Sequence, residues 1–325
     1  MRFALVLPAV LVLVAFARGA AADGGGRAEA VAYGSGRVWT TVRDRVVAVD
    51  PVTGRTLGGL GTGVFGNAIV VANGTLWRLQ PHELVGIRVS TGRVRARVGL
   101  GQASYALAAT ANAVWTASFD SDTLTKAEAR SGRRVLRVRV PHWPMAIAAG
   151  SRAIWVASIG RAHSVRGGVI VPDGRGVLAR VDAASGAVRA RILVGRGPRA
   201  LALDGDTVWV LEGRGVGARG QVDRVDVPRG RVMSSVKVPH WPEALAVGRR
   251  YVWVVSSPRS AGGVLTRIDK RTLRTVTQRI AGSWVPAAVT LAGGGVWAAD
   301  PGVAALIRIN PHTLAITKRV TFPVG

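Results

Sequence analysis

The chain has 325 residues, no cysteine and a formal net charge of +26. The absence of cysteine excludes disulfides, thiol chemistry and cysteine-based metal sites, although a chain of about 300 residues buries enough surface to fold without them. Only four of the 44 basic residues are lysines. This excess of arginine attracts anions, so cell-wall polymers, acidic lipid surfaces and nucleic acid are the partners that it favours.

The N-terminus has the pattern of a secretory signal peptide. Met1 and Arg2 form a short positive region, an apolar stretch of 15 residues follows at Phe3–Ala17, and Ala20–Ala22 supplies small residues for cleavage. The apolar stretch is short for a membrane span and contains Pro8, which makes an uncleaved anchor the weaker alternative. The sequence therefore predicts an extracytoplasmic protein, secreted or associated with the cell envelope.

This interpretation divides the chain into a cleaved signal peptide at residues 1–22, a short linker at 23–26 and a single domain at 27–325. Within that domain seven tryptophans recur, each directly after Val, Ile or Leu, at spacings of 38, 38, 40, 54, 44 and 44 residues. They are Trp39, Trp77, Trp115, Trp155, Trp209, Trp253 and Trp297. A period of about 40 residues is typical of a repeat architecture.

An alanine in a short apolar run precedes each of these tryptophans by nine residues: Ala30, Ala68, Ala106, Ala146, Ala200, Ala244 and Ala288. The unit at 242–280 shows the complete pattern. Its sequence predicts four strands, at Glu243–Val247, Tyr251–Val255, Val264–Asp269 and Leu273–Ile280, because β-branched and aromatic residues alternate with turn signals. Four strands repeated seven times predict an all-β fold, a seven-bladed β-propeller of four-stranded antiparallel blades.

The turn between the third and fourth strands has its own signature. The third strand ends in a short acid or amide in five units, whose side chain can bond the backbone of the turn: Asp50, Asp182, Asp226, Asp269 and Asn310. A glycine follows in five units, as a left-handed turn residue requires: Gly54, Gly92, Gly132, Gly186 and Gly230.

The propeller explains the two recurring residues. Only a small side chain fits where the innermost strands crowd toward the axis, and tryptophan fills the wedge between neighbouring blades. The first unit starts with a first strand and the last unit ends with a fourth strand at 315–324. The ring is therefore predicted to close by packing of blade 1 on blade 7, without a swapped strand.

At this point the chain resembles the YVTN-type repeat propellers of bacteria. The segments 144–148, 153–157 and 177–186 carry the resemblance, which covers 27–325 and implies an exported seven-bladed disc used mostly for binding. The related streptogramin lyases typically place an acid three positions after the tryptophan. Here only Glu212 and Asp300 match that pattern, so no catalytic residue is carried over to this chain.

Connectivity sorts the loops onto two faces. The connections between blades and the loops from second to third strand share one face, here named the upper face, and functional residues are expected among its variable loops. Near-identical segments, Pro141–Pro144 and Pro239–Pro242, have the sequence Pro-His-Trp-Pro, and Ser283–Pro286 is a partial third copy. The binding candidates on this face, near the channel mouth, are His142, Trp143, His163, Glu212, His240, Trp241, Glu243, Trp284 and Asp300.

Two interpretations of these candidates remain open. A pocket with aromatic walls, imidazoles and carboxylates suits a sugar, a cyclic peptide or a metal. Alternatively, the Pro-His-Trp-Pro segment is a rigid linker between blades that recurs through duplication of its unit. No metal site is predicted, because no His-x-His or His-x₃-His spacing exists, and the sequence predicts no cofactor.

Arginines alternate with apolar residues on several predicted fourth strands, as in 93–97, 137–139 and 189–191. On an outermost strand they prevent association between sheet edges, or they dock an anionic polymer. We therefore expect a monomeric binding module with an unknown ligand at the upper face, and an anionic cell-wall polymer or membrane surface as a further partner. Nucleic acid is a less accessible partner for an exported protein. The alternative function is an enzyme, streptogramin-lyase-like or a hydrolase, that uses the His/Trp-rich face.

Overall fold

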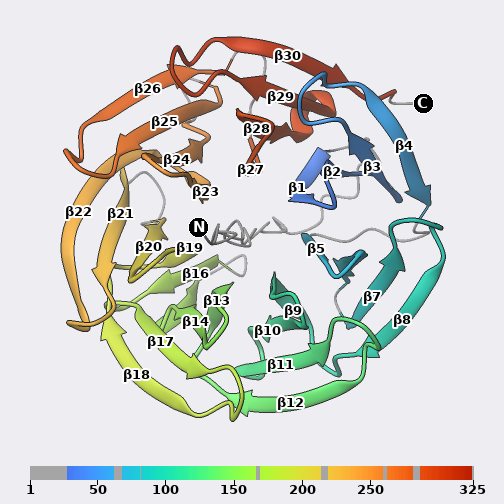
Figure 1. Cartoon of the computed structure of the whole chain (residues 1–325). Helices are drawn as coiled ribbons and strands as arrows, with labels where there is room; N and C mark the ends of the chain where they lie inside the picture. The colour runs from blue at the N-terminus through green and yellow to red at the C-terminus, as the bar shows by residue number, and fades with distance from the viewer. Residues whose placement is uncertain are drawn as a thin grey trace, which may run out of the picture.

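The computed structural model describes residues 28–61, 68–80, 82–165, 169–213, 219–258, 262–280 and 286–323. These residues form seven blades of four antiparallel strands, arranged in a ring around a central axis (Figure 1). The predicted all-β, seven-bladed architecture is therefore confirmed. The predicted signal peptide and linker lie outside the described residues.

Each blade uses four strands from one continuous segment, ordered from the axis to the rim. Blades 1 and 2 comprise β1 Ala28–Gly34, β2 Arg37–Val42, β3 Arg45–Val49, β4 Thr56–Gly61, β5 Ala68–Ala72, β6 Thr75–Leu79, β7 Glu83–Arg88 and β8 Val94–Gly99. Blades 3 and 4 comprise β9 Ser104–Ala109, β10 Ala113–Ser118, β11 Thr123–Glu128, β12 Arg134–Arg139, β13 Pro144–Ala149, β14 Ala153–Ser158, β17 Val177–Asp182 and β18 Val188–Leu193.

The remaining blades follow the same order. Blades 5 to 7 comprise β19 Pro198–Asp204, β20 Thr207–Glu212, β21 Arg219–Asp226, β22 Arg231–His240, β23 Pro242–Val247, β24 Tyr251–Ser256, β25 Val264–Asp269, β26 Thr275–Arg279, β27 Ala288–Ala292, β28 Gly295–Asp300, β29 Ala305–Ile309 and β30 Ile316–Thr321. A separate hairpin, β15 Ala162–Val165 and β16 Val169–Pro172, is inserted between β14 and β17. The helical turn η1, Pro301–Val303, is too short to cross a membrane, and no membrane-spanning helix occurs in the described ranges.

The recurring tryptophans fill the wedges between blades, as predicted. All seven are at most 5% exposed. Trp77 of blade 2 shares a core cluster with Val114 and Ala127 of blade 3, and Trp253 of blade 6 shares one with Val296 of blade 7. Burial of so large a side chain contributes apolar contact area between neighbouring blades.

The ring closes by packing. The recurring alanines of the innermost strands are at most 1% exposed, which agrees with the crowding expected near the axis. Val31 and Val38 of blade 1 lie in the same core cluster as Trp297 and Ala299 of blade 7. Within the described residues no strand of one blade completes the sheet of another. The predicted closure without a swapped strand is therefore confirmed for this part of the chain.

The turns between third and fourth strands form the predicted side-chain bonds. Oδ1 of Asp269 accepts hydrogen bonds from the backbone N–H groups of Thr272 and Arg271. The bond from Thr272, followed by the side-chain bond from Arg250, lowers the pKa of Asp269 to about 2. In all seven blades, the residue four positions after the equivalent of Asp269 has a left-handed conformation. Five blades have glycine at this position, and the last two have Leu273 and Leu314.

Candidate functional site

Aromatic rings stack at the junction of blades 3 and 4, on the predicted upper face. Tyr105 contacts Phe119 edge to face, with ring centroids 6.1 Å apart. Phe119 then stacks on Trp143 at 5.2 Å, and Trp143 stacks on His142 at 4.8 Å. This aromatic ladder, Tyr105–Phe119–Trp143–His142, links a strand, a loop and the Pro-His-Trp-Pro segment. Its last member, His142, has a side chain that is 54% exposed.

One carboxylate holds the end of the ladder in place. Oδ1 of Asp122 accepts the backbone N–H of Trp143 at 2.8 Å, and Oδ2 lies 2.7 Å from Nδ1 of His142. Trp143 has φ +56°, a left-handed conformation that costs energy for a tryptophan. The bonds of Asp122 and the stacking of Trp143 with Phe119 and His142 offset that cost. The orientation of His142 is therefore fixed before any ligand arrives.

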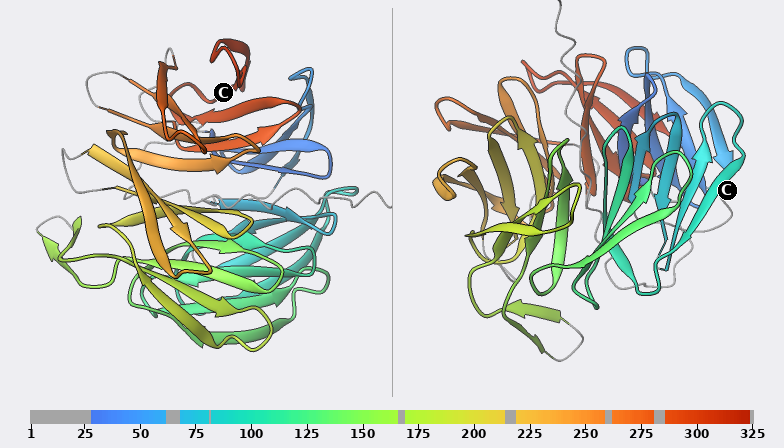
Figure 2. Two further views of the ribbon diagram at one scale, coloured as in Figure 1. Left: turned by 60° about the vertical axis from the view of Figure 1, so that its left-hand side comes forward. Right: turned by 60° about the horizontal axis from the view of Figure 1, so that its bottom comes forward.

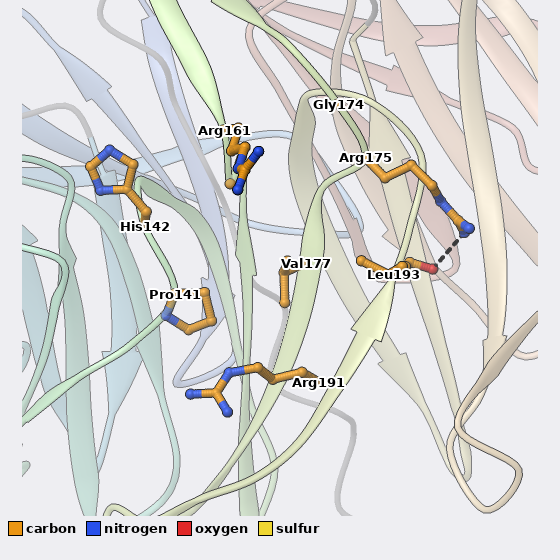
Figure 3. Close-up of a pocket in the computed structure, with 9 residues that line it drawn as sticks. Pro141, His142, Arg161, Gly174, Arg175, Val177, Arg191 and Leu193 are labelled. Atoms are coloured by element: carbon orange, nitrogen blue, oxygen red, sulfur yellow. Dashed lines mark hydrogen bonds between the residues drawn. The ribbon is translucent and has the colours of Figure 1, made fainter.

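A pocket of about 480 Å³ begins where the ladder ends. Figure 3 shows Arg161 and Val177 between Pro141 and His142 on one side and Leu193 on the other. The remaining lining residues are Gly160, Gly174, Arg175 and Arg191. Residues of β18, the outermost strand of blade 4, belong to this lining, so His142 faces a pocket that extends toward the rim of the disc.

The three arginines of the pocket have different environments. Arg175 donates to the backbone carbonyls of Leu193 and Val194 at 2.8 and 3.2 Å, and its guanidinium points away from the pocket centre (Figure 3). Arg161 and Arg191 are exposed. Neither forms an ion pair with any residue that the structure describes. Two uncompensated guanidinium groups therefore accompany His142 at this pocket.

His163 belongs to the inserted hairpin and lies apart from the ladder. Its Nδ1 pairs with Oδ1 of Asp173 beyond the end of β16, and both side chains are about half exposed. Figure 2 shows the hairpin standing out from the disc. His142 and His163 thus each have a carboxylate partner, but these are two separate pairs. No group of three potential metal ligands occurs in the described part of the chain.

Glu212 is fully buried at the end of β20. Its Oε1 accepts the backbone N–H of Gly195 at 2.5 Å, and the Gln221 side chain bonds both Glu212 and Asp223, which is 2% exposed. The same N–H of Gly195 also lies 3.2 Å from Oδ2 of Asp223. The structure thus places Glu212 in an internal polar network that fixes the connection between blades 4 and 5.

In other blades, the residue three positions after the recurring tryptophan also bonds the backbone of a neighbouring loop. Ser118 and Ser158 donate their hydroxyls to the carbonyls of Ala103 and Pro141, which lie in the preceding inter-blade connections. Asp300 is 1% exposed and its Oδ1 accepts the N–H of Gly302 in η1. The residues at this position that match the streptogramin-lyase pattern therefore lie beneath the surface.

The second Pro-His-Trp-Pro copy lies between blades 5 and 6. His240 and Trp241 are partly exposed, and Trp241 has φ +54°, close to the value of Trp143. Glu243 forms an ion pair with Arg199 at 2.9 Å, which joins the innermost strands β23 and β19 of neighbouring blades. The remaining sequence candidate, Trp284, lies outside the described residues.

The structure brings only part of the predicted set together. His142 and Trp143 meet in the ladder, whereas His163, Glu212, Glu243 and Asp300 occupy separate environments. Sequence reasoning missed the ladder residues Tyr105 and Phe119 and the pocket residues Arg161 and Arg175. The sequence indicates only that these residues lie in upper-face loops or at strand ends, as many other residues do.

A row of arginines lies on β12, the outermost strand of blade 3. Arg134, Arg137 and Arg139 of β12 are exposed, and none of them forms an ion pair among the described residues. The intervening Leu136 and Val138 pack against the core cluster that blades 3 and 4 share. This alternation separates Arg137 and Arg139 from the two apolar residues, and a register shift in the pairing of β11 with β12 brings Arg134 to the same face as Arg137.

The fold is similar to that of three solved structures. Hydrazine synthase of Kuenenia stuttgartiensis matches with TM-score 0.67 and 14% identity over 79% of this chain and 86% of that chain. The computationally designed protein Ika8 matches with TM-score 0.67 and 13% identity over 97% and 92% of the two chains. BamB from Moraxella catarrhalis matches with TM-score 0.57 and 12% identity over 84% and 82%.

No protein-family model and none of the curated proteins matches the sequence. At identities of 12–14% the three structural matches establish the architecture alone. By sequence pattern and by structure, the chain is a seven-bladed β-propeller.

Proposed function

We propose that this protein is an extracytoplasmic binding module that docks on an anionic cell-wall polymer through the row Arg134, Arg137 and Arg139. The observation that carries the proposal is that three exposed guanidinium groups share one outer strand without an ion-pair partner in the described structure. A polymer with regularly spaced negative groups provides several contacts at once, each weak by itself.

Protection of the sheet edge is the competing explanation of these arginines. The outermost strand of blade 1, β4, has the sequence TLGGLG and carries no charge, although it is equally an outer edge. Edge protection therefore does not require a row of arginines on every blade. This uneven distribution supports a role in docking for β12.

The test compares two triple variants of the chain from residue 23 on. Binding to immobilised poly(glycerol phosphate) is measured between about 50 and 300 mM salt, because the Debye length shortens across that range. Arg134→Gln/Arg137→Gln/Arg139→Gln should weaken binding about tenfold at low salt, since each exposed pair contributes up to about 1 kcal/mol. The control removes the same charge from blade 6, by Arg271→Gln/Arg274→Gln/Arg279→Gln, and should retain binding.

Equal losses in the two triple variants would reduce the interaction to net charge and overturn the docking surface. Absence of binding at low salt would overturn the proposed function. Binding to anionic vesicles with a higher affinity than to the polymer would assign the surface to a membrane instead. Aggregation of the β12 variant with unchanged affinity in its soluble fraction would support edge protection.

A second candidate function is an enzyme of the hydrolase or lyase class that uses His142. The observation that favours it is the bond between Asp122 and Nδ1 of His142, which leaves Nε2 of a neutral ring as a proton acceptor at the edge of a pocket. The test is turnover of p-nitrophenyl acetate and bis(p-nitrophenyl) phosphate. Activity of the parent protein that is abolished in His142→Asn would support an enzyme. Equal rates for the parent protein and for His142→Asn would rule out this candidate function.

A further inference from the structure

We propose that the pocket beside His142 is a specific subsite for one phosphate-bearing sugar or polyol unit. The proposal rests on the proposed function in one respect, because a polymer of the cell wall would present such units to the pocket. The pocket would be a discrete binding site, in addition to the arginine row of β12 that binds the polymer by charge. The two are separable by experiment, since a single unit can be tested without the polymer.

Charge makes a phosphate group the expected ligand. Arg161 and Arg191 have no ion-pair partner among the described residues, and no carboxylate belongs to the pocket lining. Two described carboxylates adjoin lining residues, and both are already bonded: that of Asp122 to Nδ1 of His142 and to the backbone of Trp143, and that of Asp173 to Nδ1 of His163. Two guanidinium groups without counter-ions favour an oxyanion, and a tetrahedral phosphate, whose oxygens can accept hydrogen bonds from several directions, more than a planar carboxylate.

The pocket also has an apolar part that a bare anion does not need. Pro141, Val177 and Leu193 contribute apolar groups to its lining, and Leu193 is 54% exposed. His142 adds a ring that is stacked with Trp143. A volume of about 480 Å³ lies within the range of small-molecule sites. The apolar residues of the lining suit the C–H groups of a sugar, and the arginines beside them suit its phosphate.

Several hydrogen bonds fix the pocket loops before a ligand binds. The N–H of Gly160, next to Arg161, donates to the carbonyl of His142 at 3.1 Å, and the N–H of Asp173 donates to the carbonyl of Arg161 at 2.9 Å. Arg175 ties its own loop to the end of β18 through Leu193. A site held by its backbone loses little conformational entropy on binding.

The second Pro-His-Trp-Pro copy shows that duplication alone does not create this pocket. Sheet register places Ala179 opposite Arg191 in blade 4, whereas Thr266 faces Thr277 at the same place in blade 6. The next pairs are Val177 with Leu193 in blade 4 and Val264 with Arg279 in blade 6. Along the outermost strand, blade 4 therefore has Arg191 followed by the apolar Leu193, whereas blade 6 has Thr277 followed by Arg279 at the corresponding positions.

A third difference concerns the loop after the second strand. The N–H of Ile159 donates to the carbonyl of Trp143, as that of Ser257 does to Trp241, so Gly160 corresponds to Pro258. Proline has no N–H to bond the carbonyl of His240. The loop that carries Arg161 is thus held to the Pro-His-Trp-Pro segment by a bond that the second copy lacks.

The experiment is calorimetric titration of the chain from residue 23 on at constant salt. Glycerol 3-phosphate and glucose 1-phosphate are the probes, with glucose, glucuronate and inorganic phosphate as comparison ligands. The sugar phosphates should bind saturably. Arg161→Gln/Arg191→Gln should weaken them about a hundredfold, since each of the two charge-assisted bonds lost accounts for about tenfold. The matched control, Arg271→Gln/Arg274→Gln, removes two exposed charges from blade 6, outside both the pocket and the arginine row, and should leave the affinity unchanged.

Each other outcome overturns part of the proposal. Glucuronate binding as tightly as glucose 1-phosphate would overturn the choice of phosphate, and inorganic phosphate binding as tightly would overturn the sugar or polyol part. Equal losses in both double variants, or no binding, would overturn the site. If the double variant fails to fold, Arg191→Gln alone serves, because this exposed strand residue should still cost about tenfold.

The polymer assay identifies the source of the phosphate unit. Tighter binding of a short poly(glycerol phosphate) than of glycerol 3-phosphate, lost in the pocket variant, indicates a polymer ligand. Tighter binding of the monoester indicates a free sugar phosphate, and the pocket then stands while the proposed polymer function falls. Polymer docking that the pocket variant leaves intact, without monomer binding, would remove the subsite and retain the proposed function.

Discussion

The backbone N–H of Trp143 donates to Oδ1 of Asp122 at 2.8 Å and thereby holds a tryptophan in a left-handed conformation. The two residues are separated by 21 positions and belong to different loops at the junction of blades 3 and 4. Strain of this kind costs about 1–3 kcal/mol and persists only where neighbouring contacts enforce it. Asp122 therefore connects backbone strain, ring stacking and the orientation of His142.

Replacement of Asp122 should separate these effects. Asp122→Ala removes two bonds to a carboxylate and should lower the free energy of unfolding by about 1.5–3 kcal/mol. Asp122→Asn retains an acceptor for the N–H of Trp143 and should cost less. Both are measured by urea denaturation, with near-ultraviolet circular dichroism reporting on the Trp143 environment. Equal stability of Asp122→Ala and the parent chain would contradict the assigned role.

Two glycines in equivalent turns should respond differently to a methyl group. Gly186 has φ +75°, and an added Cβ would lie 2.5 Å from Cγ1 of Val138 on the neighbouring blade. Gly230 has φ +62° and open space around the same position. Gly230→Ala should therefore cost about 1–2 kcal/mol, from the left-handed conformation alone. Gly186→Ala should cost about 2–4 kcal/mol, because overpacking adds to that strain.

Urea denaturation of the two alanine variants, under one buffer condition, checks this order. A cost at Gly186 no greater than that at Gly230 would mean that blades 3 and 4 separate slightly without penalty. That result would also argue against a pocket held rigidly between these blades.

Glu212 should prove structural. An added Cβ at Gly195 would lie 1.8 Å from Oε2 of Glu212, so Gly195→Ala should destabilise the chain by about 1–3 kcal/mol. In a Glu212→Ala background the obstructing carboxylate is absent, and the same change should cost much less. A double-mutant cycle measures this coupling. Additive costs, or loss of polymer binding in Glu212→Ala without loss of stability, would contradict a purely structural role.

Acid should weaken the fold through the turns between third and fourth strands. The pKa of Asp269 falls to about 2 in the folded protein, against about 3.9 for an unfolded aspartate. Its stabilising contribution is thus complete above about pH 4 and disappears as the pH falls toward 2. The pKa values of Asp50, Asp182 and Asp226 are lowered by the same kind of backbone bond, so they act in the same direction.

The check is the urea midpoint of Asp269→Asn and of the parent chain at pH values from 2 to 7. Asparagine keeps the acceptor without titrating, as Asn310 does in blade 7. The variant should therefore lose less stability than the parent between about pH 4 and pH 2. Identical pH profiles for the two proteins would show that this turn does not contribute to acid sensitivity.

The architecture could be predicted because its determinants are local and repeated. The period of the tryptophans gave the number of blades, and the short acids or amides with the glycines after them gave the turns. These features depend on backbone geometry and on burial of a large ring, which act in the same way in every unit. The two leucines at left-handed positions, Leu273 and Leu314, show the limit, since packing overrides the glycine preference there.

The candidate site could be predicted only in part, because its contacts join segments that the repeat pattern does not relate. The sequence by itself determined a propeller, the upper-face position of His142 and Trp143, and a surplus of arginine. Only the tertiary structure decided that Asp122 meets His142, that Arg161 and Arg191 approach the same pocket, and that Glu212 turns inward. The physical reason is that loop conformation and inter-blade packing, rather than residue type, determine which side chains meet.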